Sequence, residues 1–301
     1  MNNFTIRQLR YFEALAQHGH FGRAAAASSI SQPALSVQIK ELEQDLGAVL
    51  FERGARQVRL TAFGEEFAQR VREVLRSVDD LGDLARASQG RLVGRLRIGV
   101  IPTIAPYLLP TLIQKLTATH AGLDIHVRET LTHKLIQELE EGQIDTAIVA
   151  LPVSTPSLTE VALFDEDFLI VRHAKDAHKP VPNTSQLQDM KLLLLEEGHC
   201  FRDQALSFCN IQSAQPREGL DASSLSTLVQ LVGAGIGITL IPEMAVAVET
   251  RSAPVVVTPF NVAGPNRTVG MVWRKTNPLA TELLEISQVV RTSALALRST
   301  K

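Results

Sequence analysis

Residues 21–47 read FGRAAAASSISQPALSVQIKELEQDLG, and this stretch decides the fold of the N-terminal part of the chain. The alanine run predicts a short helix over residues 22–29 that ends in a Ser-Ser-Ile turn. Ser31 can cap the next helix, Pro33 is tolerated in a first helical turn, and Gly47 can end the helix. Two short helices joined by a tight turn predict a helix-turn-helix. The second helix buries an apolar stripe formed by Leu35, Ile39, Leu42 and Leu46.

The flanking segments extend this motif on both sides. Apolar residues three and four positions apart predict a helix from Ile6 to His18. Residues 50–60 are Arg-rich and alternate in polarity, which predicts a β-hairpin wing. Thr61 can then cap a helix that runs to about Gln89 and carries a heptad seam. A seam needs a partner, so we expect a homodimer; the alternative is a helix packed on its own α/β lobe. The seam residues are Phe67, Val71, Val74, Val78, Leu81 and Ala85.

Beyond Gly94, short strands alternate with helices, which predicts an α/β region with a mostly parallel sheet. We expect three parts: a winged helix-turn-helix DNA-binding domain at 1–61, a linker and dimerisation helix at 62–90, and a regulatory domain at 91–301. The regulatory domain is expected to form two α/β lobes around a cleft, as periplasmic-type binding proteins do. Lobe I would take about 95–165 and 268–301, and lobe II about 166–267.

Composition and charge narrow the function classes. The 301-residue chain is 45% hydrophobic, has a net charge of −2, and contains no apolar run long enough to span a bilayer. The first residues, Met1–Leu15, lack the layout of a secretory signal, so we expect a cytoplasmic protein. Residues 1–61 carry seven basic and five acidic side chains, so DNA binding must depend on the shaped motif and on two copies of it. The histidines are scattered and the Gly-rich run at 233–237 lacks a dinucleotide-site context, so we expect neither a metal nor a cofactor.

The N-terminal 65 residues resemble the LysR-type transcriptional regulators, and the remainder is similar to the peroxide-sensing OxyR branch of that family. The N-terminal match is carried by Leu9-Arg10-Tyr11-Phe12, Ser31-Gln32-Pro33-Ala34-Leu35-Ser36, Leu50-Phe51-Glu52-Arg53 and Leu60-Thr61 with Gly64. The C-terminal match is carried by Ile101-Pro102-Thr103, Pro106-Tyr107-Leu108-Leu109-Pro110, Thr132-His133, Gly198-His199-Cys200-Phe201-Arg202-Asp203-Gln204-Ala205, Phe208-Cys209 and Arg267-Thr268. The cysteine block is the specific part, because the Gly-Ile-Thr-Leu-Ile-Pro segment at 237–242 and the linker features occur in many LysR relatives.

The recognition helix and the wing supply the candidate DNA contacts. Short polar or methyl-bearing side chains suit base edges, and guanidinium groups suit phosphates or the minor groove. The helix contributes Gln32, Pro33, Ala34, Ser36 and Val37, and the wing contributes Arg53 and Arg56. The alternative is that these residues only cap the helix or stay solvated.

Two cysteines, Cys200 and Cys209, are either a redox pair or inert buried thiols. The resemblance implies that Cys200 is the peroxidatic thiol, Cys209 is the resolving thiol, and an intramolecular disulfide is the active signal. If the intervening segment is helical, the nine-position spacing corresponds to about 13 Å, whereas a disulfide needs α-carbons within about 7 Å. Forming the bond must therefore refold this segment, as a switch requires.

The resemblance also implies a peroxide site and a set of partners. The site would contain Thr103, Thr132, His199, Arg202, Asp203 and Arg267. The threonines would bind peroxide or water, while His199 and Arg202 would favour the reactive thiolate of Cys200. The expected partners are operator DNA, a second copy in a dimer that forms a tetramer, RNA polymerase, hydrogen peroxide, and a thiol reductant such as glutaredoxin or thioredoxin.

We therefore expect a transcriptional activator of antioxidant genes. Two alternatives remain. One is a LysR-type regulator that binds a small metabolite between the lobes, with incidental cysteines. The other is a thiol peroxidase, which we disfavour because an enzyme of that kind has no use for a DNA-binding module.

Overall fold

The structure is a computed structural model that describes residues 4–54, 57–87, 93–183, 186–187, 190–208, 221–260 and 264–298. The chain divides into two compact units, residues 1–85 and residues 86–301. The N-terminal unit is built on one hydrophobic core, and the larger unit is built on two. None of the helices in the described part of the chain has the length and apolar character needed to cross a membrane.

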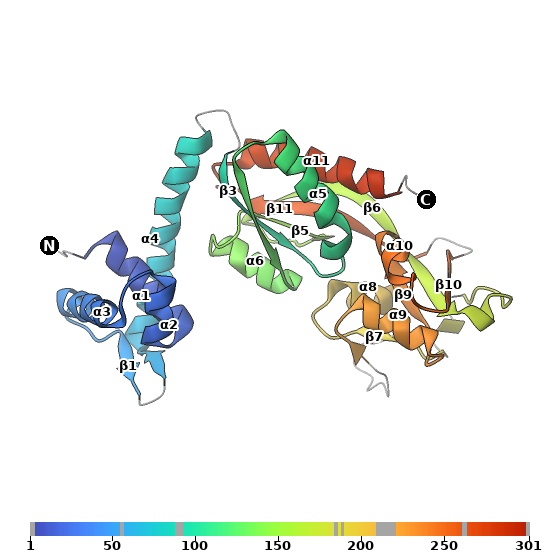
Figure 1. Cartoon of the computed structure of the whole chain (residues 1–301), viewed down its shortest axis with the longest axis horizontal. Helices are drawn as coiled ribbons and strands as arrows, with labels where there is room; N and C mark the ends of the chain where they lie inside the picture. The colour runs from blue at the N-terminus through green and yellow to red at the C-terminus, as the bar shows by residue number, and fades with distance from the viewer. Residues whose placement is uncertain are drawn as a thin grey trace. The chain divides into compact units, whose positions relative to one another are not determined.

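The N-terminal unit is a winged helix-turn-helix (Figure 1). Its elements are α1 (Ile6–His18), α2 (Phe21–Ala27), α3 (Gln32–Leu46), β1 (Phe51–Arg53), β2 (Val58–Leu60) and α4 (Ala62–Ala87). The ring of Phe12 lies at the centre of the core, with centroids 5.2 Å from Phe51 and 5.1 Å from Phe67. The wing and α4 are thus fixed to the helix-turn-helix by aromatic packing.

Ser31, Gly47 and Thr61 cap the ends of helices in this unit, as predicted. Ser31 Oγ accepts a hydrogen bond from the amide of Ala34 at 3.3 Å, and Gly47 ends α3 in the left-handed conformation. Thr61 Oγ1 accepts from the amide of Gly64 at 2.9 Å. A Cβ atom on Gly64 would overlap the carbonyl oxygen of Leu50, which explains a glycine in the first turn of α4. These interactions confirm where α3 and α4 begin.

The heptad prediction for α4 is wrong for the first part of the helix. Phe67 and Val71 pack into the core of their own unit, because α4 crosses the helix-turn-helix over its first turns. Further along, Val74 is 45% exposed, Leu81 is 66% exposed and Ala85 is exposed. The apolar surface that needs a partner is therefore confined to the C-terminal half of α4.

The larger unit contains a seven-stranded sheet with the order β10-β6-β11-β5-β3-β4, in which β9 also pairs with β6. Its strands are β3 (Gly94–Val100), β4 (Leu123–Glu129), β5 (Thr146–Leu151), β6 (Leu158–His173), β9 (Thr239–Pro242), β10 (Val255–Thr258) and β11 (Asn266–Arg274). Only β3 forms parallel pairs in it, with β4 and β5. The expectation of a mostly parallel sheet is wrong, because the long strands β6 and β11 run antiparallel to each other and to their other neighbours.

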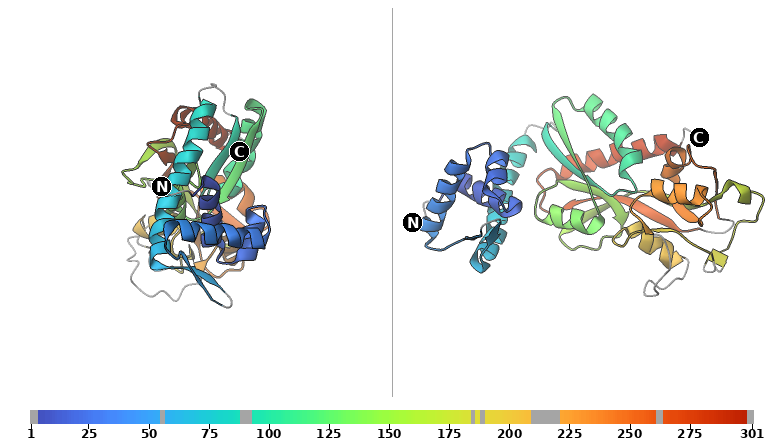
Figure 2. Two further views of the ribbon diagram at one scale, coloured as in Figure 1. Left: turned by 90° about the vertical axis from the view of Figure 1, so that its left-hand side faces the viewer. Right: turned by 60° about the horizontal axis from the view of Figure 1, so that its bottom comes forward.

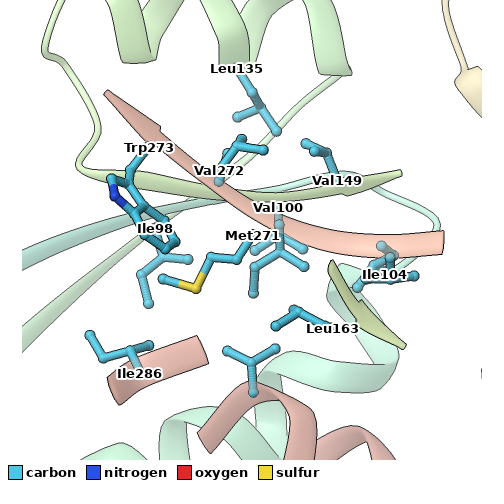
Figure 3. Packing of buried hydrophobic residues seen from close by; sticks show 14 of the residues in the cluster. Ile98, Val100, Ile104, Leu135, Val149, Leu163, Met271, Val272, Trp273 and Ile286 are labelled. Carbon is cyan, nitrogen blue, oxygen red and sulfur yellow. The ribbon is translucent and has the colours of Figure 1, made fainter. Parts of the chain in front are cut away.

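The first lobe is a sheet covered by helices on both faces (Figures 1 and 2). Helices α5 (Ala105–Thr119) and α11 (Ala280–Arg298) cover one face, and α6 (Thr132–Glu140) covers the other. Figure 3 shows Leu135 of α6 on one side of the strands and Ile286 of α11 on the other, with Ile98 and Met271 packed between the sheet and α11. These residues are at most 1% exposed, so the lobe has a continuous dry core.

The second lobe is built around the other ends of β6 and β11. It adds β7 (Leu194–Leu195), α8 (Cys200–Phe208), β8 (Asp221–Ala222), α9 (Leu225–Gly233) and α10 (Val246–Glu249), with short 3-10 turns η1 (Ala174–Asp176) and η2 (Glu243–Ala245). Tyr107 of α5 joins the core of this lobe, and its hydroxyl donates to Glu249 at 2.7 Å. Burial, with help from Glu249, raises the pKa of Tyr107 well above its usual range. The predicted fold class is confirmed: a winged helix-turn-helix, a linker helix and a two-lobed α/β regulatory domain.

Candidate functional site

A small cavity lies beside Cys200 and is formed by three segments far apart in the sequence. Residues 101–103 follow β3, Leu131 and Thr132 lie at the start of α6, and residues 198–201 lead into α8. The cavity volume is about 10 Å³, which is the space for about one water-sized molecule. A partly buried thiol therefore faces a chamber that only a very small molecule can enter.

Local geometry fixes Cys200 at the first position of α8. Gly198 has φ +94°, and a Cβ atom there would lie 3.1 Å from Cδ1 of Leu131, the residue that precedes α6, so a glycine suits this position. Phe201 is 1% exposed, and its ring centroid lies 4.5 Å from that of Phe168 in β6. These contacts hold the first turn of α8 against both α6 and the sheet.

Arg202 anchors the other side of α8. Its Nη1 donates to the carbonyl oxygen of Leu195 at 2.7 Å and lies 2.9 Å from Asp221 Oδ2. The cationic side chain thus ties α8 to β7 and β8. The acidic partner of Arg202 is Asp221, whereas its neighbour in the sequence, Asp203, lies exposed on the helix.

A buried polar network supports the cavity wall at Thr103. Arg267 Nη1 donates to Thr103 Oγ1 at 2.7 Å, and Nη2 donates to the carbonyl oxygen of the same threonine at 3.1 Å. Arg267 also pairs with Glu166 at 2.7 Å, and the second oxygen of Glu166 accepts from the amide of Met244 at 2.8 Å. Because Thr103 Oγ1 accepts from a cation, its own hydroxyl hydrogen is left to donate elsewhere.

Thr132 faces the same cavity with a buried hydroxyl that finds no hydrogen-bond partner among the described residues. A buried hydroxyl without a partner costs about 1–3 kcal/mol, and such groups are usually satisfied by a water or a ligand. The cavity is therefore suited to a small hydrogen-bonding molecule rather than to an apolar one.

His199 is a buried neutral group rather than a cation. Burial lowers the pKa of its imidazole below the usual 6.5, and the carboxylate of Glu196 opposes this only partly. At neutral pH the ring thus offers one N–H donor and one acceptor beside Cys200.

Three of the six predicted peroxide-site residues, Thr103, Thr132 and His199, line the cavity together with Cys200. Arg267 reaches the cavity through Thr103, whereas Arg202 and Asp203 lie on α8 and are not among its lining residues. Cys209 lies outside the described residues.

The candidate DNA-contact residues lie at the start of α3. Gln32, Pro33, Ala34 and Val37 are exposed, and Val37 is 53% exposed although it is apolar; Ser36 is half-buried. Arg53 is the last residue of β1 in the wing, and Arg56 lies outside the described residues. An exposed, largely uncharged helical surface of this kind is suited to base edges.

Glu166 is a site residue that the sequence motifs did not indicate. It is 1% exposed and pairs with Arg267, its neighbour across β6 and β11. The segment Phe164-Asp165-Glu166-Asp167 looks like a solvated acidic run. The signal that could have identified Glu166 is strand parity, because it shares its face of β6 with the buried Phe168 and Ile170.

Two family descriptions match the chain: "Bacterial regulatory helix-turn-helix protein, lysR family" over residues 6–65, and "LysR substrate binding domain" over residues 89–293. A probable hydrogen peroxide-inducible genes activator of Streptomyces viridosporus is 42% identical over 95% of this chain and 93% of its own length. The DNA-binding transcriptional dual regulator OxyR of Escherichia coli K12 is 40% identical over 95% of both chains.

Solved structures of OxyR proteins also resemble this chain. A full-length OxyR variant from Pseudomonas aeruginosa has a TM-score of 0.77 and 36% identity, covering 97% of this chain and 96% of its own. A cysteine-to-serine OxyR variant of Corynebacterium glutamicum with bound hydrogen peroxide has a TM-score of 0.68 and 35% identity, covering 98% and 95%. The resemblance therefore extends over the whole fold.

Proposed function

The chain belongs to the LysR family of bacterial transcriptional regulators and to its OxyR branch, and from this premise we propose that it senses hydrogen peroxide through Cys200 and activates antioxidant genes. The observation that carries the proposal is the cavity at Cys200, which has room for about one water-sized molecule. It is lined by the Thr132 hydroxyl, which has no hydrogen-bond partner in the described part of the chain. Peroxide is small enough and polar enough to satisfy both features. As a regulator, the protein would react once per activation rather than turn over.

The chemistry begins with the Cys200 thiolate, which attacks one oxygen of hydrogen peroxide. An S–O bond forms as the O–O bond breaks, giving a sulfenic acid and a hydroxide ion that takes a proton to become water. The hydroxyls of Thr103 and Thr132 would donate to the departing oxygen, and the Arg267 guanidinium strengthens the donor at Thr103. In the second step the Cys209 thiol attacks the sulfenic sulfur, so that a disulfide forms and a second water leaves.

The disulfide would act as a switch because the reduced fold cannot contain it. Helix α8 runs from Cys200 to Phe208, so the α-carbons at its two ends are separated by a helical rise of about 12 Å. A disulfide needs α-carbons within about 7 Å, so α8 must unwind. Unwinding would release Phe201 from Phe168 and Arg202 from Leu195, and this would repack the second lobe.

The N-terminal unit would deliver this signal to DNA. We assign base contacts to Gln32, Pro33, Ala34, Ser36 and Val37, and backbone contacts to Arg53 and Arg56. Dimerisation would use the exposed half of α4, and two dimers would form the tetramer that contacts RNA polymerase. A thiol reductant such as glutaredoxin or thioredoxin would reset the switch. The three-part division at residues 1–61, 62–90 and 91–301 belongs to the same proposal.

The alternative of a metabolite regulator predicts a different response. A cavity of about 10 Å³ at Cys200 is far below the range of about 300–1,000 Å³ typical of metabolite sites, so a metabolite would have to bind away from this thiol. We therefore favour the thiol switch and test it by footprinting the protein on its own promoter, reduced and peroxide-treated, with Cys200→Ser and Cys209→Ser alongside. The thiol switch predicts a footprint that shifts only in the wild type. A shift in both variants, or in none of the proteins, would assign the signal to something else.

A further inference from the structure

A second, larger cavity of about 320 Å³ lies on the first lobe, and none of its lining residues lines the cavity at Cys200. Its volume falls within the range of about 300–1,000 Å³ found for small-molecule sites. Its walls include Arg95 and Arg97 of β3, His126 and Arg128 of β4, and Glu138 of α6. The peroxide chemistry uses none of these side chains.

The strand register brings the basic residues to one face of the sheet. Arg95 and Arg97 are two positions apart on β3, and Arg97 lies opposite His126 while Gly99 lies opposite Arg128. Because side chains alternate between faces, all four basic side chains lie on the face that carries α6. Gly99 lets α6 and the loop after it pack closely on that face, since a Cβ atom there would lie 2.6 Å from Leu135 Cδ2 and 2.7 Å from Ile144 Cδ1.

The charges of this cavity are only partly neutralised within the protein. Arg97 is held by the buried Asp145 at 2.6 Å and serves the fold. The Arg128 guanidinium lies 3.0 Å from a carboxylate oxygen of Glu138, and the Arg128 side chain is 53% exposed. The Arg95 side chain is 63% exposed, and its Nε atom lies 4.0 Å from a carboxylate oxygen of Asp124. Three arginines and one glutamate line the cavity, whereas Asp145 and Asp124, the partners of Arg97 and Arg95, are not among its lining residues.

We propose that this cavity binds a small molecule bearing carboxylate or phosphate groups. Guanidinium groups hold both classes of oxyanion through paired N–H donors, and Arg95 has donors to spare. Arg128 can exchange Glu138 for the ligand or share both. His126 lies between the two arginines along β4, with its Nε2 atom 2.9 Å from Asp124 Oδ2. A set of merely solvated arginines would instead bind anions weakly, without saturation, and in proportion to their charge alone.

The test is isothermal titration calorimetry of the full-length reduced protein with sodium pyrophosphate and with sodium citrate, at ionic strength matched with sodium chloride. The proposal predicts saturable binding of at least one probe, and the tighter of the two identifies phosphate or carboxylate as the natural ligand chemistry. Arg95→Gln should weaken that binding at least about tenfold. Arg251→Gln, which removes an exposed arginine from the second lobe, should leave it unchanged.

Two results would overturn the proposal. One is the absence of saturation by either probe up to about 10 mM, a concentration well above the dissociation constants of specific metabolite sites. The other is an equal loss of binding in Arg95→Gln and Arg251→Gln, which would mean that the anions respond only to overall charge. Circular dichroism of both variants would show that the fold is retained, as expected for exposed arginines.

Discussion

The two threonines of the cavity are expected to respond in opposite ways to the same substitution. Thr132→Val removes a buried hydroxyl that has no partner among the described residues, so the reduced protein should keep its stability or gain up to about 1 kcal/mol. Thr103→Val removes an acceptor from the buried guanidinium of Arg267, so it should cost about 1–3 kcal/mol. For a unit of this size, each kcal/mol corresponds to about 2–4 °C in Tm.

Both variants should nevertheless slow the oxidation of Cys200. A hydrogen bond to a developing charge contributes about 1.5–3 kcal/mol, which is about 10- to 150-fold in rate. The assay is quenched-flow alkylation of the remaining Cys200 thiol after mixing with peroxide, in a Cys209→Ser background that isolates the first step. Melting curves of the reduced variants give the stabilities. If Thr132→Val destabilises the protein as much as Thr103→Val, or reacts at the wild-type rate, the assignment of Thr132 as a free donor is refuted.

Three other substitutions test the surroundings of the site. Glu166→Gln leaves the buried Arg267 without a counter-charge and should cost about 3–5 kcal/mol in unfolding experiments, whereas the exposed Asp167→Asn should change stability by less than about 0.5 kcal/mol. Similar losses in both variants would contradict a special role for Glu166. Because burial lowers the pKa of His199, the neutral ring favours the folded state, and this stability should be lost as the pH falls below about 6.5. Melting curves of His199→Gln should depend less on pH in that range, and a slope equal to that of the wild type would reject the argument. Leu81→Asp should convert the dimer to monomers in sedimentation experiments, and an unchanged dimer would place the interface elsewhere.

Local sequence signals predicted the N-terminal unit well. The helix over residues 6–18 was confirmed at both ends, and Ser31 and Gly47 bound α3 as their chemistry requires. The heptad pattern of α4 gave the wrong environment for Phe67 and Val71, because periodicity reports which face is apolar but not what covers it.

The regulatory domain was harder to predict where strands are long. Strand β6 begins at Leu158, and its first half is hard to predict because it mixes apolar and acidic residues. Antiparallel pairing of β6 with β11 links residues about 100 positions apart, and no local pattern encodes such a pair. The resemblance predicted Thr103, Thr132, His199 and Cys200, which line the cavity. Glu166 could be predicted only from the alternation of buried and exposed residues along β6, and this requires knowing the full extent of that strand.

The buried network is placed where it can connect the thiol to both lobes. Arg267 and Glu166 face each other across β11 and β6, the two strands that pass from one lobe into the other. Two residues further along β6, Phe168 packs against Phe201, the second residue of α8. Unwinding of α8 would therefore remove a packing partner from the strand that carries Glu166. The hydrogen bond from Met244 to Glu166 adds a second link to the same lobe.

This arrangement gives a physical reason for keeping a buried ion pair at the joint of the two lobes. Desolvating two charges is costly, and the pair is stable only while Thr103 and Met244 supply the remaining hydrogen bonds. An apolar pair of the same volume would tolerate many relative positions of the strands, but a fully bonded ion pair tolerates few. We therefore expect the two lobes to switch between discrete arrangements. An apolar replacement of both Glu166 and Arg267 should keep the fold but make the conformations of the reduced and oxidised states less distinct.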